Sequence, residues 1–139
     1  MSDVRRLFKY VVWFGVAVNW AFGIWAIFID PHGLIETLRL GPQASILWLY
    51  NYSVLLMILS LFYLPAAKNP FRYRANAWLL IVGRLVPAST FLFGYLVGLM
   101  PRGFLTLMLG DGTIGILELI LLIKVFRQGP RPDDLKVDA

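Results

Sequence analysis

Four apolar segments of about twenty residues each constrain the fold of this chain more than any other feature of its sequence. They extend roughly over residues 10–29, 44–66, 75–99 and 103–126, and proline, glycine or aspartate residues stand at their ends. An α-helix rises 1.5 Å per residue, so about 20 apolar residues cross the hydrocarbon core of a bilayer. The sequence therefore predicts an all-α integral membrane protein, a bundle of four transmembrane helices.

The composition is that of a chain surrounded mostly by lipid. Of its 139 residues, 59% are hydrophobic and 15% are charged, whereas about a quarter of a soluble domain is charged. The basic start before the first apolar run resembles a signal peptide, but the run is long enough to span and no small-residue cleavage site follows. We expect a retained first helix, one membrane domain over residues 1–139, and a mobile cytoplasmic tail at 127–139.

The basic residues predict how the helices are oriented. Ten of them flank one side of the spans, namely Arg5, Arg6, Lys9, Lys68, Arg72, Arg74, Lys124, Arg127, Arg131 and Lys136. Only Arg39 and Arg102 flank the other side. Cytoplasmic loops carry an excess of Lys and Arg, so the N-terminus, the second connection and the C-terminus are predicted to face the cytoplasm. The first outer connection, at 30–41, has an apolar face and predicts a short helix in the membrane interface.

The composition also excludes several classes of function. The chain has no cysteine and only one histidine, His32, which excludes disulfides, thiol redox chemistry and thiolate-bound metals. We therefore predict no metal site. The net charge of +5 does not indicate nucleic-acid binding, because the cations lie beside apolar spans where anionic lipid headgroups meet them.

Charged side chains within the apolar spans are expected to have a partner, because a charge in hydrocarbon is costly unless it is paired or hydrated. Arg84 lies roughly 10 Å inside the third span from its cytoplasmic end, and Glu118 lies roughly 9 Å inside the fourth. Consecutive antiparallel helices are usually neighbours, so we predict an intramembrane ion pair between Arg84 and Glu118. The pair is either a structural clamp or part of a polar site for a quinone headgroup, a proton or a lipid phosphate. Pro87, one turn beyond Arg84, predicts a bend there.

A second set of polar residues lies further from the cytoplasmic end. Asp111 is two helical turns before Glu118 on about the same face, at a depth similar to that of Asn51 and Tyr52. These groups are predicted to form a polar network, or to contact a ligand. Asn19 is predicted to belong to the same polar network or ligand contacts, and it lies near mid-membrane between Gly15 and Gly23, in a stripe of small residues that suits close helix contact.

The second half of the chain resembles a known group of membrane proteins. The run from Tyr63 to Arg74, YLPAAKNPFRYR, is followed by Gly83-Arg84 in the third span and by Leu109-Gly110-Asp111-Gly112 at the start of the fourth. These features resemble the DoxX-like families of small four-helix bacterial membrane proteins, over about residues 44–127. The resemblance implies a bacterial cytoplasmic membrane. It matches Arg84 and Asp111 to family positions but implies no catalytic residue, because the families have none established.

Three functions are compatible with these features. The first is a non-catalytic accessory or structural subunit, or an anchor, of a larger membrane complex of the electron-transfer kind, since no residue set can hold a redox centre. The second is a quinone- or lipid-binding component of a membrane oxidoreductase, with electrons supplied by a partner. The third, a small dimeric transporter, is disfavoured because Arg84 at the depth of Glu118 would hold that carboxylate ionised.

These functions imply the same kinds of ligand and partner. We expect no catalytic activity of the isolated chain and no cofactor of its own beyond a bound quinone or lipid. Membrane lipids, other membrane-protein subunits or further copies of the chain are the expected partners, and nucleic acid is not.

Overall fold

The computed structural model describes residues 3–41 and 45–135, and all regular secondary structure within them is helical. The elements are α1 (Asp3–Ile24), the π-helical turn η1 (Trp25–Ile29), α2 (Pro31–Thr37), α3 (Ile46–Leu61), α4 (Leu64–Lys68), α5 (Arg74–Leu96), α6 (Phe104–Arg127) and the 3₁₀ turn η2 (Pro132–Leu135). Four helical stretches, Asp3–Ile29, Ile46–Lys68, Arg74–Leu96 and Phe104–Arg127, are long and apolar enough to cross a membrane. The chain is a multi-pass membrane protein with an all-α fold.

The ends of the helices follow local chemistry. Asp30 ends the first stretch and begins the next helix, because its carboxylate accepts a hydrogen bond from the Gly33 backbone N–H at 2.8 Å, with Pro31 in the first turn. The second stretch is interrupted at residues 62–63. There the backbone N–H groups of Phe62 and Tyr63 bond only three residues back, and Pro65, which has no N–H to donate, stands in the first turn of α4.

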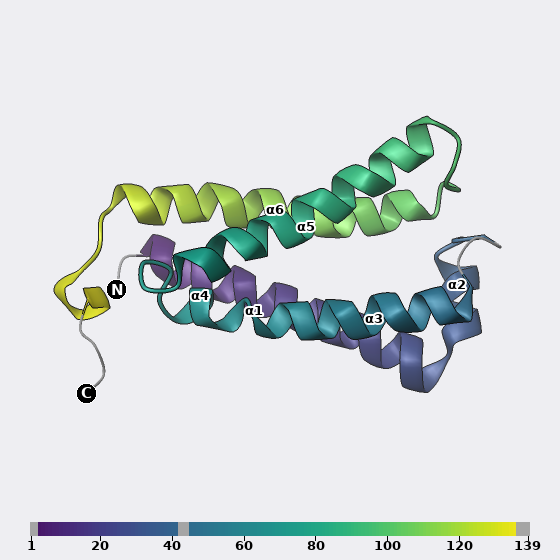
Figure 1. The fold of residues 1–139 in the computed structure, drawn as a ribbon, viewed down its shortest axis with the longest axis horizontal. Coiled ribbons are helices and arrows are strands. Elements are labelled where there is room, and N and C mark those ends of the chain that lie inside the picture. The colour runs from purple at the N-terminus through teal and green to yellow at the C-terminus, as the bar shows by residue number, and fades with distance from the viewer. Residues whose placement is uncertain (1–2, 42–44, 136–139) are drawn as a thin grey trace.

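The helices form a bundle in which α1 is central (Figure 1). Helix α5 packs against α6, α1 packs against both α3 and α6, and α4 packs against α1 and α5. The N- and C-terminal segments lie at one end of the bundle and α2 lies at the other. Towards the α2 end, α5 diverges from α3 (Figure 1).

The interior consists of apolar clusters at the two ends and a polar cluster between them. At the terminal end the core includes Phe8, Tyr63 and Leu122. At the α2 end, Phe91 and Phe104 pack with Tyr52 beside them. The outer surface is also apolar, with large hydrophobic side chains exposed on all four long stretches, as expected where the surrounding solvent is lipid.

The C-terminal segment folds back on the bundle. The sequence predicts a mobile tail from residue 127, but α6 ends at Arg127 and the residues after it dock between the start of α1 and the loop after α4. Asp134 accepts a hydrogen bond from Arg5 at 2.6 Å through its side chain, and its backbone carbonyl accepts one from Asn69 at 3.0 Å. Residues 136–139 of the predicted tail lie outside the described residues.

The docked segment should open when the Asp134 carboxylate is neutralised. Its partial burial raises its pKa, but the Arg131 backbone N–H and the Arg5 guanidinium outweigh this effect and lower the pKa. Because the folded pKa is below the unfolded one, the contact contributes stability above the ordinary aspartate pKa of about 3.9 and is lost as the pH falls through the lower folded value. Asp134→Asn is expected to produce the same opening at neutral pH.

Cleavage by trypsin after Arg127, at the end of α6, measures this opening. We expect Asp134→Asn to be cut several times faster than the parent protein. Asp3→Asn, an exposed aspartate at the same end of the bundle, should leave the rate unchanged. A spin label on a single cysteine at position 130 should gain mobility on acidification. Equal cleavage rates in all three proteins would show that the contact does not hold the segment.

Candidate functional site

Arg84 stands at the centre of the polar cluster. It lies in the middle of α5 and is only 1% exposed. Its Nε lies 3.0 Å from Oε2 of Glu118, which is completely buried in α6. The structure thus brings together the two residues that the sequence predicts as an ion pair, across the interface between the third and fourth long helices.

The same guanidinium also reaches further along α6. Arg84 Nη1 lies 3.0 Å from Oδ1 of Asp111, in an ion pair that is also a hydrogen bond, and 3.5 Å from Oδ1 of Asn19 on α1. The hydroxyl of Tyr52 on α3 donates to the other Asp111 oxygen at 3.4 Å. One arginine therefore connects two carboxylates that are seven residues apart, and the cluster draws on α1, α3, α5 and α6.

The polar atoms of the cluster are only partly satisfied. The Arg84–Glu118 contact is close but is not aligned as a hydrogen bond, and both carboxylate oxygens of Glu118 lack a hydrogen-bond partner among the described residues. The same is true of Arg84 Nη2 and Asn19 Nδ2. Buried polar groups are normally paired, and ionisable residues inside a membrane mark candidate functional sites.

Close approach of the helices makes room for the guanidinium. Gly15 of α1 faces Arg84 so closely that a Cβ there would lie 3.0 Å from the arginine Cζ and would overlap Nη2. Gly115 of α6 lies against the arginine stem, because a Cβ there would come within 3.0 Å of the Arg84 Cβ. The ring of Tyr63 lies 5.7 Å from the guanidinium carbon, at a distance where a cation–π contact stabilises the charge.

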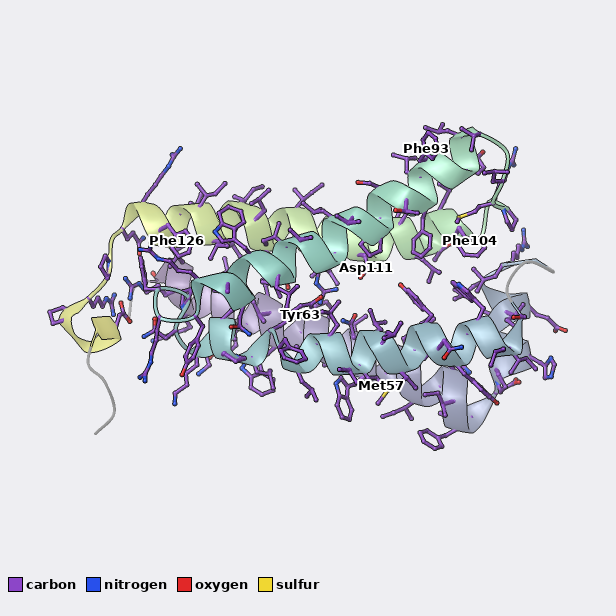
Figure 2. The ribbon with its side chains drawn as sticks, in the orientation of Figure 1. Met57, Tyr63, Phe93, Phe104, Asp111 and Phe126 are labelled. Carbon is purple, nitrogen blue, oxygen red and sulfur yellow. The ribbon has the colours of Figure 1, made fainter. Side chains whose placement is uncertain are left out.

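A crevice of about 220 Å³ opens beside Asp111, between α1, α3 and α6. Most of its lining is apolar, and its polar residues are Asn19, Tyr52, Thr106 and Asp111. Asp111 lies between the α5–α6 pair and the α1–α3 pair (Figure 2). Its side chain is 13% exposed, whereas that of Glu118 is inaccessible, so Asp111 is the carboxylate that a ligand in the crevice could contact.

The remaining polar residues singled out in the sequence lie elsewhere. Asn51, predicted to join Tyr52 and Asp111, is exposed, and its amide donates to the Leu47 carbonyl of its own helix at 3.0 Å. Gly23, the other member of the predicted small-residue stripe, faces Met57 of α3 and takes no part in the cluster.

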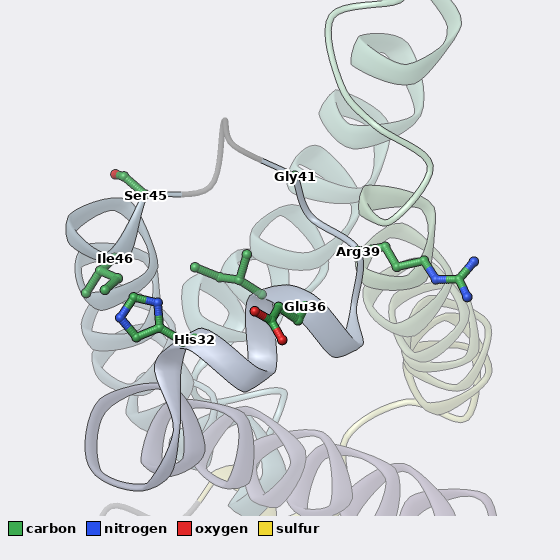
Figure 3. A pocket seen from close by; sticks show the side chains of 7 residues that line it. His32, Glu36, Arg39, Gly41, Ser45 and Ile46 are labelled. Carbon is green, nitrogen blue, oxygen red and sulfur yellow. The ribbon is translucent and has the colours of Figure 1, made fainter.

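His32 also lies far from the cluster. It borders a hollow of about 580 Å³ at the α2 end, together with Glu36 and Arg39 (Figure 3). All three side chains are exposed, and Arg39 points away from the other two. No group of three or more His, Cys, Asp or Glu side chains in the described part of the chain could hold a metal ion.

Two members of the cluster escape sequence reasoning. Tyr63 lies near the end of a span, where aromatic residues are enriched at the membrane interface, and the sequence predicts Gly15 only as a small residue for helix contact. The spacing of four between Gly15 and Asn19 places both on one face of α1, but nothing in the sequence indicates that Gly15 faces the Arg84 guanidinium.

The charges define what the cluster can do chemically. With all three groups ionised, one guanidinium faces two carboxylates, so the cluster carries a formal charge of −1 in a region of low dielectric. A proton on the accessible Asp111, or a hydrogen-bond donor placed against it, would relieve this excess. The crevice beside Asp111 therefore suits a neutral ligand better than an anionic one.

Comparison of the chain with protein-family models, with curated proteins and with solved structures gave no match.

Proposed function

We propose that this chain is a non-catalytic membrane component that holds the head of an apolar ligand, most favourably a quinone, in the crevice beside Asp111. One observation carries the proposal. Asn19 is 3% exposed, its Nδ2 has no hydrogen-bond partner among the described residues, and its side chain lines the crevice. The guanidinium of Arg84 can only donate, so it holds the amide oxygen and leaves the amide N–H groups able to donate to a ligand.

The size and charge of the crevice favour a quinone over an anionic lipid. Sites that enclose a whole small molecule measure roughly 300–1,000 Å³, so about 220 Å³ suits a headgroup whose tail leaves towards the lipid. A phosphate would add negative charge beside Asp111, which already belongs to a cluster of formal charge −1. A neutral quinone carbonyl instead accepts a hydrogen bond from Asn19 and brings no charge to the cluster.

Binding of a short-chain benzoquinone to the purified protein tests this proposal. Asn19→Leu keeps the branching of the side chain and removes its amide, so we expect affinity to fall about three- to tenfold, as for the loss of one neutral hydrogen bond. Asn51→Leu is the matched control, since Asn51 lies outside the cluster, and it should bind like the parent protein. Equal affinities of the two variants, or no binding by the parent protein, would contradict the proposal.

A second candidate is an accessory subunit or anchor in a larger complex of a bacterial cytoplasmic membrane, with both termini in the cytoplasm and α2 in the outer interface. The many exposed apolar side chains support it, for example Phe28 at 75%, Leu47 at 71% and Phe93 at 65%, because partner helices could cover them as readily as lipid. Purification of the native protein in mild detergent distinguishes the candidates. A stoichiometric larger complex supports the second, and a lone protein with copurified quinone supports the first.

A further inference from the structure

Two lysines lie together at the end of the bundle that holds the termini. Lys9 of α1 and Lys68 of α4 border the same two hollows. Both side chains are exposed, and neither has an ion-pair partner among the described residues. Two unpaired cations side by side attract an anion more strongly than either would alone.

The first hollow, of about 200 Å³, is basic. Besides the two lysines, its charged lining residues are Arg5, Arg131 and Asp134. The Asp134 carboxylate is already engaged by the Arg5 guanidinium and the Arg131 backbone N–H. Four cations therefore face one carboxylate, and the hollow has a net positive charge that nothing in its lining neutralises.

The second hollow, of about 810 Å³, is an open groove between α1 and the α3–α4 stretch. Apart from the lysines at its edge it is lined by Trp13, Leu61, Leu64, Pro65 and Tyr73. Trp13 is one turn from Lys9 on the same face of α1. The lining of the groove is mainly apolar and aromatic. Large side chains on its walls are half exposed, for example Trp13 at 49% and Leu61 at 47%.

We propose that the two hollows together bind one anionic phospholipid. The phosphate lies between Lys9 and Lys68 at the mouth of the basic hollow, and an acyl chain lies along the groove against Trp13 and Leu61. A basic hollow that continues into an apolar groove matches the two halves of such a lipid in charge and polarity. A quinone carries no negative charge that could pair with the lysines. A zwitterionic lipid also carries a cationic group, which the lysines repel.

Native mass spectrometry of the detergent-solubilised protein, with phosphatidylglycerol or phosphatidylcholine added in equal amounts, tests this site. We expect the parent protein to retain phosphatidylglycerol preferentially. Each of Lys9→Gln and Lys68→Gln should reduce that preference about fivefold, and the double variant more. The matched control is Lys124→Gln with Arg127→Gln, which removes two exposed charges from the last turn of α6, outside both hollows.

Three results would overturn the proposal. The first is equal retention of the two lipids by the parent protein. The second is an equal loss of preference in the control pair, which would show a general effect of net charge. The third is displacement of the lipid by inorganic phosphate as effectively as by short-chain phosphatidylglycerol, which would show that the groove contributes nothing. If the double variant does not fold, the two single variants still decide the matter.

Discussion

Replacing Arg84 with alanine is expected to lower the free energy of unfolding by about 3–5 kcal/mol, the typical loss when one partner of a buried ion pair is removed. The reason is that Asp111 and Glu118 would remain in the interior as two unpaired carboxylates. Unfolding of the protein in detergent, followed by circular dichroism, measures the change. Arg102→Ala, at an exposed position between α5 and α6, is the control and should change stability by less than about 0.5 kcal/mol.

A double-mutant cycle with Glu118→Ala tests whether the two residues interact directly. Each single variant leaves a buried charge behind, and the double variant removes both members of the pair. Its loss of stability should therefore be smaller than the sum of the single losses, by about 1 kcal/mol or more. Strict additivity would mean that the 3.0 Å contact makes no direct contribution. Glu118→Ala alone should be milder than Arg84→Ala, because Asp111 still pairs with the arginine.

Gly15→Ala is expected to destabilise the bundle by about 1–3 kcal/mol, the usual effect of overpacking a filled interior. The new methyl group would collide with the Arg84 guanidinium and lie 3.2 Å from Glu118 Oε1. The end of an exposed arginine would simply move aside, but this one is held by two carboxylates. The substitution should therefore also weaken the ion pairs.

Gly110→Ala is the control for this effect. It lies in the interior of α6, where an added Cβ meets no other atom within 4 Å. Alanine favours a helix over glycine by about 1 kcal/mol, so this variant should be as stable as the parent or slightly more stable. Thermal unfolding of the two variants in the same detergent measures the difference. A Gly15→Ala variant as stable as Gly110→Ala would show that the guanidinium is not confined as the structure has it.

Much of the fold follows from the sequence because a bilayer restricts the choices. A span must be long, apolar and helical, so the apolar runs predict the four stretches to within a few residues at most of their ends. The exceptions have local causes. Helix α1 begins at Asp3, since nothing in residues 3–9 breaks a helix, and the second stretch is interrupted just before Pro65.

The contacts of the candidate site can be predicted where they depend on the depth of a residue along its helix. They cannot be predicted where they depend on how far a side chain reaches. Depth brings Arg84 to the level of Glu118. That the same guanidinium also contacts Asp111 depends on its reach along roughly 10 Å of α6, for which the sequence holds no signal. Asn51 and Tyr52 are at equal depth, but neighbours on a helix point about 100° apart, so only one of them can face Asp111.

The docked C-terminal segment lay beyond sequence reasoning for a different reason. Arg5 and Asp134 are 129 residues apart, and neither belongs to a periodic pattern. Polar, proline-containing residues after the last span have the composition of a mobile end. Their docking depends on where the start of α1 and the loop at Asn69 come to lie, which only the assembled bundle determines.

The division of the polar cluster between helices has a consequence for biogenesis. Arg84 is in the third long helix, and both of its countercharges are in the fourth. When α5 first emerges from the ribosome, its arginine has no carboxylate to meet, and a lone arginine at a helix centre opposes membrane insertion by about 2.5–3.5 kcal/mol. Only a short loop at residues 97–103 separates α5 from α6. The two helices are therefore expected to enter the bilayer together as a hairpin, so that neutralisation of the charge coincides with insertion.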